Sequence, residues 1–523
     1  MKKIILSISL FTFTLSFAQN IKYSFGQEFE TVKKHQDFGF YKFSNNKYAE
    51  VYFKKEEDMM FQIYDEKFNT IQREETAILP VIGSKHVAHE MFKPIKNNYY
   101  WFYSTWDRKT ETERLFAQPF NQANFKFTSN PINLIETGRL TDVYDKYHFS
   151  TSTDSSKLLV TYKVKPKIKR DKLNKDIIGF NLFDSQMKKL FAAEIQMPYS
   201  EFDMDNLGYK VDSRGNIYML TQVKLNNSLD GETNKENKNA YRYELVRVNQ
   251  KESKLEVIKI ELENKYTSSV SLTEDLQHNI VVTGYYSNKK NSVSTDGAYI
   301  AKLELNDNSS VKKFNITYCE FPLEVLKAYE SERAKKKMDK KNKKDDLEAN
   351  NLKFDRVVFE KDGSMVIIGE VNYIITYTYM CGKSMCTSTS YYSEDIYILK
   401  ADNTGKAQWC SKIPKSQYGD YSNMSHHFHQ YNGEYYFFYL DNIKNQNLPL
   451  TEAPISTAGG RGSYLNCVKI DGNGKMTKKF VFDPKEEEVR IYPREFESIN
   501  QNIIVDRLNE DRKHSKVFKL EID

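Results

Sequence analysis

The sequence predicts an all-β protein: a single β-propeller of eight four-stranded blades, with seven blades as the alternative count. Three observations predict this fold. The chain is rich in Tyr (36) and Phe (33) and poor in Pro (12), which favours strands over helices and disorder. A turn-and-strand unit recurs along the chain, and one strand near the N-terminus belongs to no repeat. A propeller arranges such four-stranded sheets around an axis, and closing the ring protects the sheet edges.

The repeated unit is a short polar turn and a strand, followed by two strands joined by a second short turn. Its clearest copy begins at Asp212, where "DSRGNIYMLTQV" precedes "YRYELVRVNQKESKLEVIKIEL". Stacked solenoids repeat at shorter periods, about 20 to 47 residues, so the observed period favours a propeller. Equivalent positions lie 52 to 85 residues apart, at Asn46, Asn98, Lys157, Asn216, Asn279, Ser364, Glu434 and Asn502.

The two ends of the chain predict how the ring closes. The last repeat contains three strands, "REFESIN", "NIIVDRL" and "KVFKLEI", and lacks a fourth. The segment "IKYSFGQEFE" near the N-terminus is a strand without a repeat of its own. We therefore expect Lys22 to Phe29 to complete the final blade as its outer strand. One propeller domain then covers residues 19–523, with a charged, partly helical insertion at 321–350.

Residues 1–18 have the pattern of a secretory signal peptide. Two lysines precede an apolar run from Ile4 to Phe17, and Ala18 follows it. The run is shorter than the roughly 20 residues that a spanning helix needs, and no later segment is long and apolar, so we expect no transmembrane segment after cleavage. The sequence therefore predicts an exported protein, periplasmic or associated with the outer membrane.

The charge balance bears on the kind of partner. Lys and Arg number 77 against 71 Asp and Glu, a formal net charge of +6 that is too mild to indicate nucleic acid. The insertion at 321–350 interleaves acidic with basic residues, which favours a solvated helix over a polyanion site. We expect a monomer without a cofactor, and an envelope protein or glycan as its partner.

The long loops are predicted to emerge on one face of the disc. If the strands of a blade are named A to D from the axis to the rim, the A–B and C–D turns are short, such as "DSRG" and "DNTG". The B–C and D–A connections share the opposite face. Because long loops on a rigid scaffold often carry function, this elaborated face is the expected binding face. The long insertions in these connections are 165–175, 225–239, 321–350, 377–392 and 442–463.

The insertion "YTYMCGKSMCTSTSYY" at 377–392 is expected to be a hairpin closed by a disulfide. A phosphate loop would need Gly where Tyr377 stands, and a metal site would need a second pair of ligands near Cys381 and Cys386. We expect a four-residue tip, Gly382 to Met385, whose flanking cysteines lie directly opposite each other and form the bond. The remaining cysteines are expected to be buried or unpaired: Cys319, Cys410 and Cys467.

Tyrosines flank this hairpin. Alternation along a strand places Tyr377 and Tyr379 on one side of the ribbon, while Tyr391 and Tyr392 return alongside. A closed, tyrosine-faced ribbon on the elaborated face is expected to act as a contact element. These four tyrosines are the predicted binding residues.

Other candidate chemistry has a simpler structural explanation. His427 and His429 share one face of a strand in "SHHFHQ" and are candidate ligands for zinc or copper. No third ligand can be named, so packing between blades or lining of the central channel is favoured. The motifs G-x-S-x-G, H-E-x-x-H and G-x-G-x-x-G are absent from the sequence, and no catalytic residue is predicted.

The chain resembles uncharacterised secreted β-propeller proteins of Bacteroidota. The resemblance rests on the ending "SFAQN" of the leader, the tyrosine-rich strands and the turns of the form DxxGN and DxxGK. It implies a secreted propeller and transfers no functional residue. The first hypothesis is a non-enzymatic binding or scaffold protein of the cell envelope that uses the long loops of one face to bind a protein or glycan. The alternative is a hydrolase or lyase that acts on a glycan or small molecule at the central channel.

Overall fold

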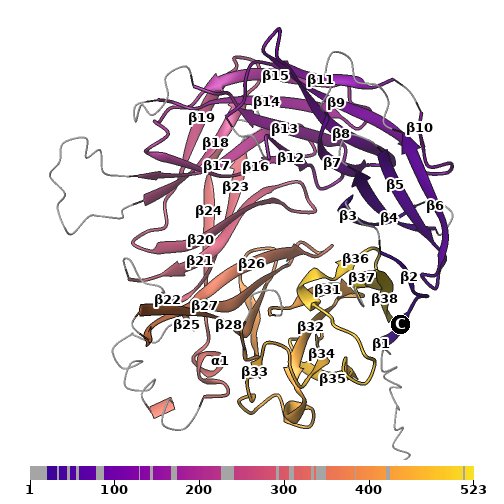
Figure 1. The fold of residues 1–523 in the computed structure, drawn as a ribbon. Helices are drawn as coiled ribbons and strands as arrows, with labels where there is room; N and C mark the ends of the chain where they lie inside the picture. Colours follow the sequence, from indigo (N-terminus) through magenta and orange to yellow (C-terminus); the bar gives the residue numbers. More distant parts are fainter. Residues whose placement is uncertain are drawn as a thin grey trace, which may run out of the picture.

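The structure of the protein is a computed structural model (Figure 1). The expected signal peptide lies outside the residues that it describes, as do all of 225–239 and most of 165–175. The described residues are 21–523 apart from 32–34, 44–46, 55–57, 78–86, 129, 142–144, 167–173, 225–240, 290–293, 306–310, 331–334, 337–348, 383, 420–423 and 510–512.

The described residues form eight sheets of four or more strands, which follow one another around the molecule (Figure 1). The first sheet contains β3 (His35–Lys42), β4 (Tyr48–Lys54), β5 (Asp58–Tyr64) and β6 (Thr70–Ala77). The second contains β7 (Val87–Ile95), β8 (Asn98–Asp107) and β9 (Thr112–Asn121), with β10 (Lys126–Phe127) and β11 (Ile132–Thr137) both paired to β9. The third contains β12 (Tyr147–Thr151), β13 (Lys157–Lys163), β14 (Ile177–Asp184) and β15 (Lys189–Gln196).

The next three sheets are also antiparallel, except that β33 pairs in parallel with β30 in the sixth. The fourth contains β16 (Met204–Val211), β17 (Ile217–Lys224), β18 (Tyr241–Asn249) and β19 (Lys254–Ile260). The fifth contains β20 (Tyr266–Glu274), β21 (Ile280–Ser287), β23 (Gly297–Leu305) and β24 (Val311–Glu320), and a small separate sheet pairs β22 (Ser294–Thr295) with β25 (Ala349–Asn350). The sixth contains β26 (Leu352–Phe359), β27 (Met365–Cys381), β28 (Ser384–Ala401), β29 (Ala407–Ile413), β30 (Gln417–Gly419) and β33 (Thr457–Ala458).

The last two sheets complete the ring. The seventh contains β31 (His427–Tyr431), β32 (Glu434–Asn442), β34 (Ser463–Ile470) and β35 (Met476–Phe482). The eighth contains β36 (Glu497–Ser498), β37 (Ile503–Asn509) and β38 (His514–Ile522) from the C-terminal end, and β1 (Ile21–Phe25) and β2 (Phe29–Glu30) from the N-terminal end. Two short 3₁₀ helices, η2 (Ile443–Asn445) and η3 (Pro493–Glu495), lie in the connections around the seventh sheet. The predicted all-β propeller is confirmed.

The N-terminal strand closes the ring as predicted. β1 runs antiparallel to β38, with Ile21 opposite Ile522 and Phe25 opposite Phe518, so that it forms the outer strand of the last sheet. The last sheet also packs on the first: Arg507 Nη1 on β37 lies 2.7 Å from a carboxylate oxygen of the buried Glu50 on β4. Both ends of the chain therefore meet in one blade.

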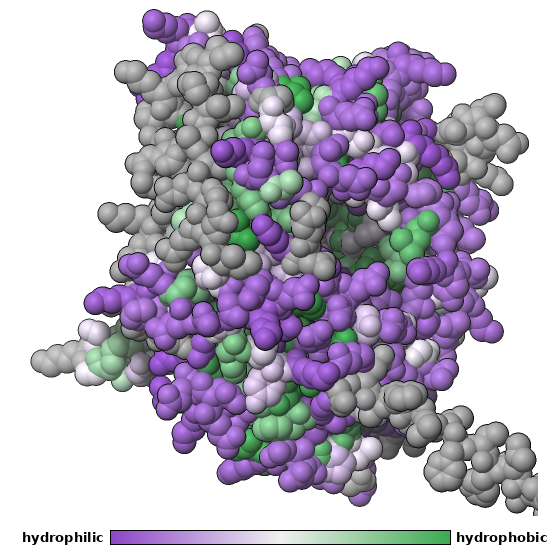
Figure 2. Space-filling view, turned by 90° about the vertical axis from the view of Figure 1, so that its right-hand side faces the viewer, coloured by the Kyte–Doolittle hydropathy of each residue, from purple (hydrophilic) through white to green (hydrophobic). Residues whose placement is uncertain are grey.

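The core is a series of hydrophobic clusters, one or two between each sheet and the next. The cluster between the last and first sheets contains Phe40, Tyr64 and Val505, so the series has no gap where the ring closes. Inner strands are covered on both faces and are apolar on both: β21 is buried along its whole length, whereas the outer strand β19 has only its last residue buried. The surface shown in Figure 2 is mainly hydrophilic, and its hydrophobic residues lie in small groups.

The Asp-containing turns are structural. In "DSRGN", Asp212 Oδ1 accepts a hydrogen bond from the backbone N–H of Asn216 at 2.8 Å, and Gly215 has the positive φ of 91° that the turn requires. In "DNTGK", Asp402 Oδ1 accepts from Thr404 and Lys406 in the same way. The side chain of each aspartate therefore closes its own turn, which explains why the motif recurs.

The insertion at 321–350 is described only in part. It begins with α1 (Leu323–Lys327), a single turn of five residues whose buried Leu326 packs in the cluster between the fifth and sixth sheets. The charged residues at 331–334 and 337–348 lie outside the described residues. No helix among the described residues is long and apolar enough to cross a membrane.

Candidate functional site

The hairpin of β27 and β28 extends far beyond the sheet to which it belongs. Its pairing with β26 ends at Val371, and its pairing with β29 ends at Ile396, although the two strands have 17 and 18 residues. The ribbon, defined here as residues 372–393, is therefore a two-stranded projection from the B–C connection of its blade. The elaborated face predicted from loop lengths carries this element.

The two faces of the ribbon differ. Strand register places Tyr373, Tyr377 and Tyr379 of β27 on one face, which we call the tyrosine face, together with Tyr392 of β28. Tyr391 lies on the other face, opposite Ile374. Both faces are exposed, because two strands without a third layer cannot cover each other's side chains. The exposed fractions are 52% and 51% for Tyr377 and Tyr379, and 59%, 65% and 67% for Ile374, Met380 and Met385.

The base of the tyrosine face widens into a small sheet. β30 pairs with β28, with Tyr418 opposite Tyr392, and β33 pairs in parallel with β30. The rings of Tyr373 and Tyr392 stack with centroids 4.7 Å apart, and Tyr418 continues the row at 6.1 Å from Tyr392. We call the ribbon, β30 and β33 the accessory sheet. It presents a row of aromatic rings, a kind of side chain that is usually buried. Apolar patches at a protein surface often mark interaction sites.

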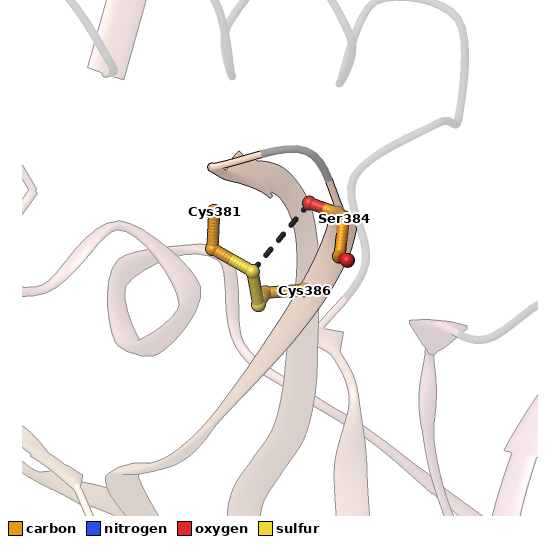
Figure 3. The surroundings of a disulfide bond; sticks show 3 residues. All are labelled: Cys381, Ser384 and Cys386. Atoms are coloured by element: carbon orange, nitrogen blue, oxygen red, sulfur yellow. Dashed lines mark hydrogen bonds between the residues drawn. A yellow bond between two sulfur atoms is a disulfide. The ribbon is translucent and has the colours of Figure 1, made fainter.

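The predicted Cys381–Cys386 disulfide is present at the tip of the ribbon (Figure 3). The geometry of the tip differs from the prediction. Cys381 lies opposite Ser384 and Cys386 lies opposite Tyr379, so only two residues separate the paired strands and the disulfide crosses the ribbon diagonally. The prediction of a four-residue tip was wrong. A two-residue connection, with Gly382 at a φ of 71°, suits the twist of a hairpin. The Cα atoms of the two cysteines remain 5.7 Å apart, within disulfide range.

A buried network of charges holds the root of the accessory sheet. Lys415 Nζ is fully buried and donates to Glu370 Oε1 at 3.0 Å, to Ser393 Oγ at 2.7 Å and to Gln417 Oε1 at 3.1 Å. These residues mark the points where β27 leaves the blade, β28 returns to it and β30 begins. Nδ1 of the buried His426 lies 3.0 Å from the same carboxylate. Because an unpaired charge is costly to bury, the network fixes these strands to one another.

The network determines the protonation state of the Glu370 carboxyl group. Burial raises the pKa of Glu370, but Lys415 and His426 outweigh burial and hold that pKa well below its ordinary value. The carboxyl group is therefore ionised at neutral pH and accepts hydrogen bonds from Lys415 and His426. It is enclosed by protein, since the side chains of Glu370, Lys415 and His426 are at most 5% exposed. This group of ionisable residues supports the accessory sheet and offers no surface to a substrate.

A pocket of about 540 Å³ opens at the edge of the accessory sheet. The end of β33 and the glycines after it form one wall, and the connection from β35 to β36 forms the other. Its size lies within the range of about 300 to 1,000 Å³ that is usual for ligand pockets. Two arginines, Arg461 and Arg490, line it from opposite walls.

The candidate metal ligands lie at the joint between two blades. His427 Nε2 and His429 Nδ1 both lie within hydrogen-bond distance of Ser498 Oγ on β36, at 3.0 and 2.8 Å. His429 Nε2 lies 2.7 Å from the backbone oxygen of Gln501. Burial, with a smaller contribution from His429, lowers the pKa of His427 to about 3, so this imidazole is neutral. No group of three or more potential metal ligands occurs among the described residues.

A second pocket, of about 430 Å³, lies on the opposite face, where the short turns gather. It contains two carboxylates, Asp212 and Glu304, together with His278. The two oxygens of Asp212 accept hydrogen bonds from the backbone and side chain of Asn216, so this carboxylate is engaged by its own turn. The three cysteines outside the disulfide are free: Cys319, Cys410 and Cys467.

Comparison with known proteins shows likeness of fold alone. No protein-family model and no curated protein sequence matches the chain. A polysaccharide lyase, Uly1, is similar over 95% of this chain and 99% of its own, at 10% identity and a TM-score of 0.37. The β-propeller domain of the Trilobed protease from Pyrococcus furiosus is similar over 86% and 96%, at 11% identity and a TM-score of 0.33. Prolyl oligopeptidase B from Galerina marginata is similar over 91% and 53%, at 8% identity and a TM-score of 0.37.

These observations define the class of protein as a β-propeller that carries an accessory sheet on one face. Sequence reasoning identified the ribbon, its disulfide and its tyrosines. It missed the pocket, because Arg461 and Arg490 come from two connections that are distant along the chain. The one sequence feature that points to this pocket is the run "AGGRGS", in which three glycines surround one arginine at the end of a long insertion.

Proposed function

We propose that the protein is a non-enzymatic binding protein of the cell envelope, and that the accessory sheet is its contact surface for a protein partner. The observation that supports this most directly is the exposure of apolar side chains on both faces of a ribbon whose two ends are fixed. The tip is closed by the Cys381–Cys386 disulfide, and the root is held by Lys415. A ribbon fixed at both ends loses little conformational entropy when it binds, which favours recognition.

The chemistry of the ribbon favours a protein over a glycan. Tyr and Met are enriched in the centres of protein interfaces. On the face away from Tyr377 and Tyr379, the tip presents the thioethers of Met380 and Met385, which lie opposite each other at 65% and 67% exposure. A thioether is only a weak acceptor for sugar hydroxyls. An oxidised disulfide supports an exported protein, since such bonds persist in oxidising compartments.

The alternative, a hydrolase or lyase at the central channel, has less support. It requires two carboxylates or a metal site around one pocket on the elaborated face. No acidic side chain lines the pocket of about 540 Å³ on that face among the described residues. Of the two glutamates at the root of the ribbon, Glu370 is buried in an ion pair with Lys415, and Glu394 accepts a hydrogen bond from Tyr373 Oη at 2.9 Å. The second pocket contains two carboxylates, but it lies among the short turns and Asp212 serves its own turn.

The proposal is tested by site-specific photo-crosslinking in intact cells. A benzophenone amino acid is placed at Tyr379 on the tyrosine face, at Met385 on the other face, and at Tyr266 on β20 as an exposed control. We expect a discrete cross-linked protein from at least one ribbon position and none from Tyr266. The partner is then identified by mass spectrometry.

A trimmed variant provides the matched control. Ile374 and Tyr391 lie opposite each other, so residues 375–390 can be replaced by an Asn-Gly turn without disturbing the blade. We expect the trimmed protein to keep its unfolding temperature and to lose the partner. Retention of the partner by the trimmed protein contradicts the proposal. Cross-linking only to a second copy of this chain, or only to glycan, contradicts the assignment of the partner.

A further inference from the structure

The pocket at the edge of the accessory sheet has an apolar floor. Leu440 on β32 and Ile491 in the connection after β35 are 5% and 3% exposed, and Val489 lies beside them. None of these side chains offers a hydrogen bond. The floor can therefore accept an aliphatic group of a ligand, and burial of that group contributes about 25 cal/mol per Å² of apolar surface.

The rim of the pocket is positively charged. Arg461 and Arg490 both line it and are exposed, and neither guanidinium forms an ion pair with a described residue. Among the described residues the lining contains no acidic side chain. A guanidinium binds a carboxylate through two parallel hydrogen bonds, so the pair favours a ligand that carries a carboxylate next to its apolar group.

The wall between these groups is half-buried backbone without side chains. Gly459 and Gly460 follow β33 with φ values of 54° and 74°, in the left-handed region that a larger residue rarely adopts. β33 pairs with β30 on one side, and no described strand pairs with its other side. The backbone oxygens on that other side are occupied within the protein, since Ser456 accepts from Asn442 Nδ2 and Ala458 accepts from the N–H of Arg461. What this wall offers an approaching peptide is therefore space without side chains.

We propose that this pocket binds the C-terminus of a protein: the terminal carboxylate contacts Arg461 and Arg490, and an aliphatic last side chain occupies the floor. This inference rests on the proposed function, because it assumes that the partner is a protein. A glycan fits less well. Both charged side chains of the lining are donors only, and they match the two oxygens of a carboxylate better than the hydroxyls of a neutral sugar. A peptide terminus meets the donors with a carboxylate and the apolar floor with its side chain.

The inference is tested with two pools of fluorescein-labelled hexapeptides. Both pools have Leu as the last residue and random residues before it; one pool ends in a free carboxylate and the other in an amide. Binding to the full-length protein is measured by fluorescence anisotropy. We expect the amidated pool to bind about tenfold more weakly or worse, since a charge-assisted hydrogen bond contributes more than a neutral one.

Variants of the two arginines assign the effect to the pocket. Arg461→Ala and Arg490→Ala should each weaken binding of the free-carboxylate pool by about tenfold. Arg108→Ala removes the same charge from an exposed position between β8 and β9 and should leave binding unchanged. Because all three side chains are exposed, the unfolding temperatures should agree with that of the wild type, which confirms that the variants fold.

Three results overturn the inference. They are equal binding of the two pools, binding that is unaffected by both pocket variants, and no binding of either pool at millimolar protein. Oligogalacturonate is tested in parallel, and its arginine-dependent binding without peptide binding assigns the pocket to an acidic glycan instead. Failure here is distinguishable from failure of the proposed function, because cross-linking at Tyr379 and Met385 reports on the ribbon and not on the pocket.

Discussion

Single residues show where the fold tolerates charge in its interior. Glu90 lies at a β-bulge of β7, where the pairing with β8 shifts between His89 and Met91. Its Oε1 accepts a hydrogen bond of 2.6 Å from Ser104, whose oxygen in turn accepts from Lys146. Burial raises the pKa of Glu90 to about 7, although Ser104 and Lys146 act in the opposite direction. The bulge thus turns a carboxyl group into a half-buried position against Ser104.

The Glu90→Gln variant is expected to change how stability depends on pH. The folded pKa, about 7, lies above the ordinary value of 4.5, so the folded state holds this proton more tightly than the unfolded chain does. The corresponding stabilisation is fully present below pH 4.5 and is lost as pH rises through 7, by up to about 3 kcal/mol. Glutamine can still accept from Ser104 but cannot ionise.

We therefore expect the unfolding temperature of the variant, relative to wild type, to increase between pH 5 and pH 8. Differential scanning calorimetry across that range measures the difference directly. The contributions of groups that titrate in both proteins to the unfolding temperature cancel in the comparison. A difference that is constant with pH would show that Glu90 has an ordinary pKa.

At the level of elements, the disulfide is expected to stabilise the ribbon and not the propeller. The bond joins residues five positions apart, outside every blade contact, so its loss changes the local opening of the hairpin. For a loop this short the chain-entropy model gives about 2 kcal/mol, which corresponds to about thirtyfold in an opening equilibrium. The variant with Cys381→Ser and Cys386→Ser should keep the unfolding temperature of the wild type.

Hydrogen–deuterium exchange measures this effect by segment. In the double serine variant, amides of residues 377–389 should exchange about thirtyfold faster, because the tip opens more often. Amides of β26 and β29, in the same sheet, serve as the internal reference and should be unchanged. Exchange that is equally accelerated in β26 would mean that the bond supports the blade itself.

The same elements show what could be derived from the sequence. Alternation along β27 places Tyr377 and Tyr379 on the same face of the ribbon, as the structure does, because side chains of a strand alternate between its two faces in any surroundings. The register at the tip could not be derived, since it depends on whether two or four residues form the turn. The pocket could not be derived either, because Leu440 and Arg490 are brought together only by the order of the blades. Lys415 and Glu370 lie 45 positions apart, and no local pattern marks a buried ion pair.

For the whole molecule, the ring is closed without a covalent connection at one place, where the N-terminal strand β1 meets the C-terminal strand β38. There the closure depends on the pairing of β1 with β38 and on packing. Tyr23 on β1 stacks on Phe482 of the preceding blade at 4.6 Å, and Phe25 contacts Phe518. A propeller that opens should therefore open here first, within its last sheet, because every neighbouring pair of blades is also joined by the chain.

A cross-link between β1 and β38 tests this expectation. Lys22 lies opposite Glu521, and cysteines at directly opposed positions of an antiparallel pair lie within disulfide range. The variant with Lys22→Cys and Glu521→Cys should, when oxidised, be more stable than when reduced by about 2–4 kcal/mol, because the bond closes a loop of nearly the whole chain. Oxidised and reduced samples are compared by urea denaturation. Wild type with and without reductant controls for the native disulfide, and the single Lys22→Cys variant controls for the substitution. Equal midpoints for the oxidised and reduced double variant would place the first opening of the ring elsewhere than between β1 and β38.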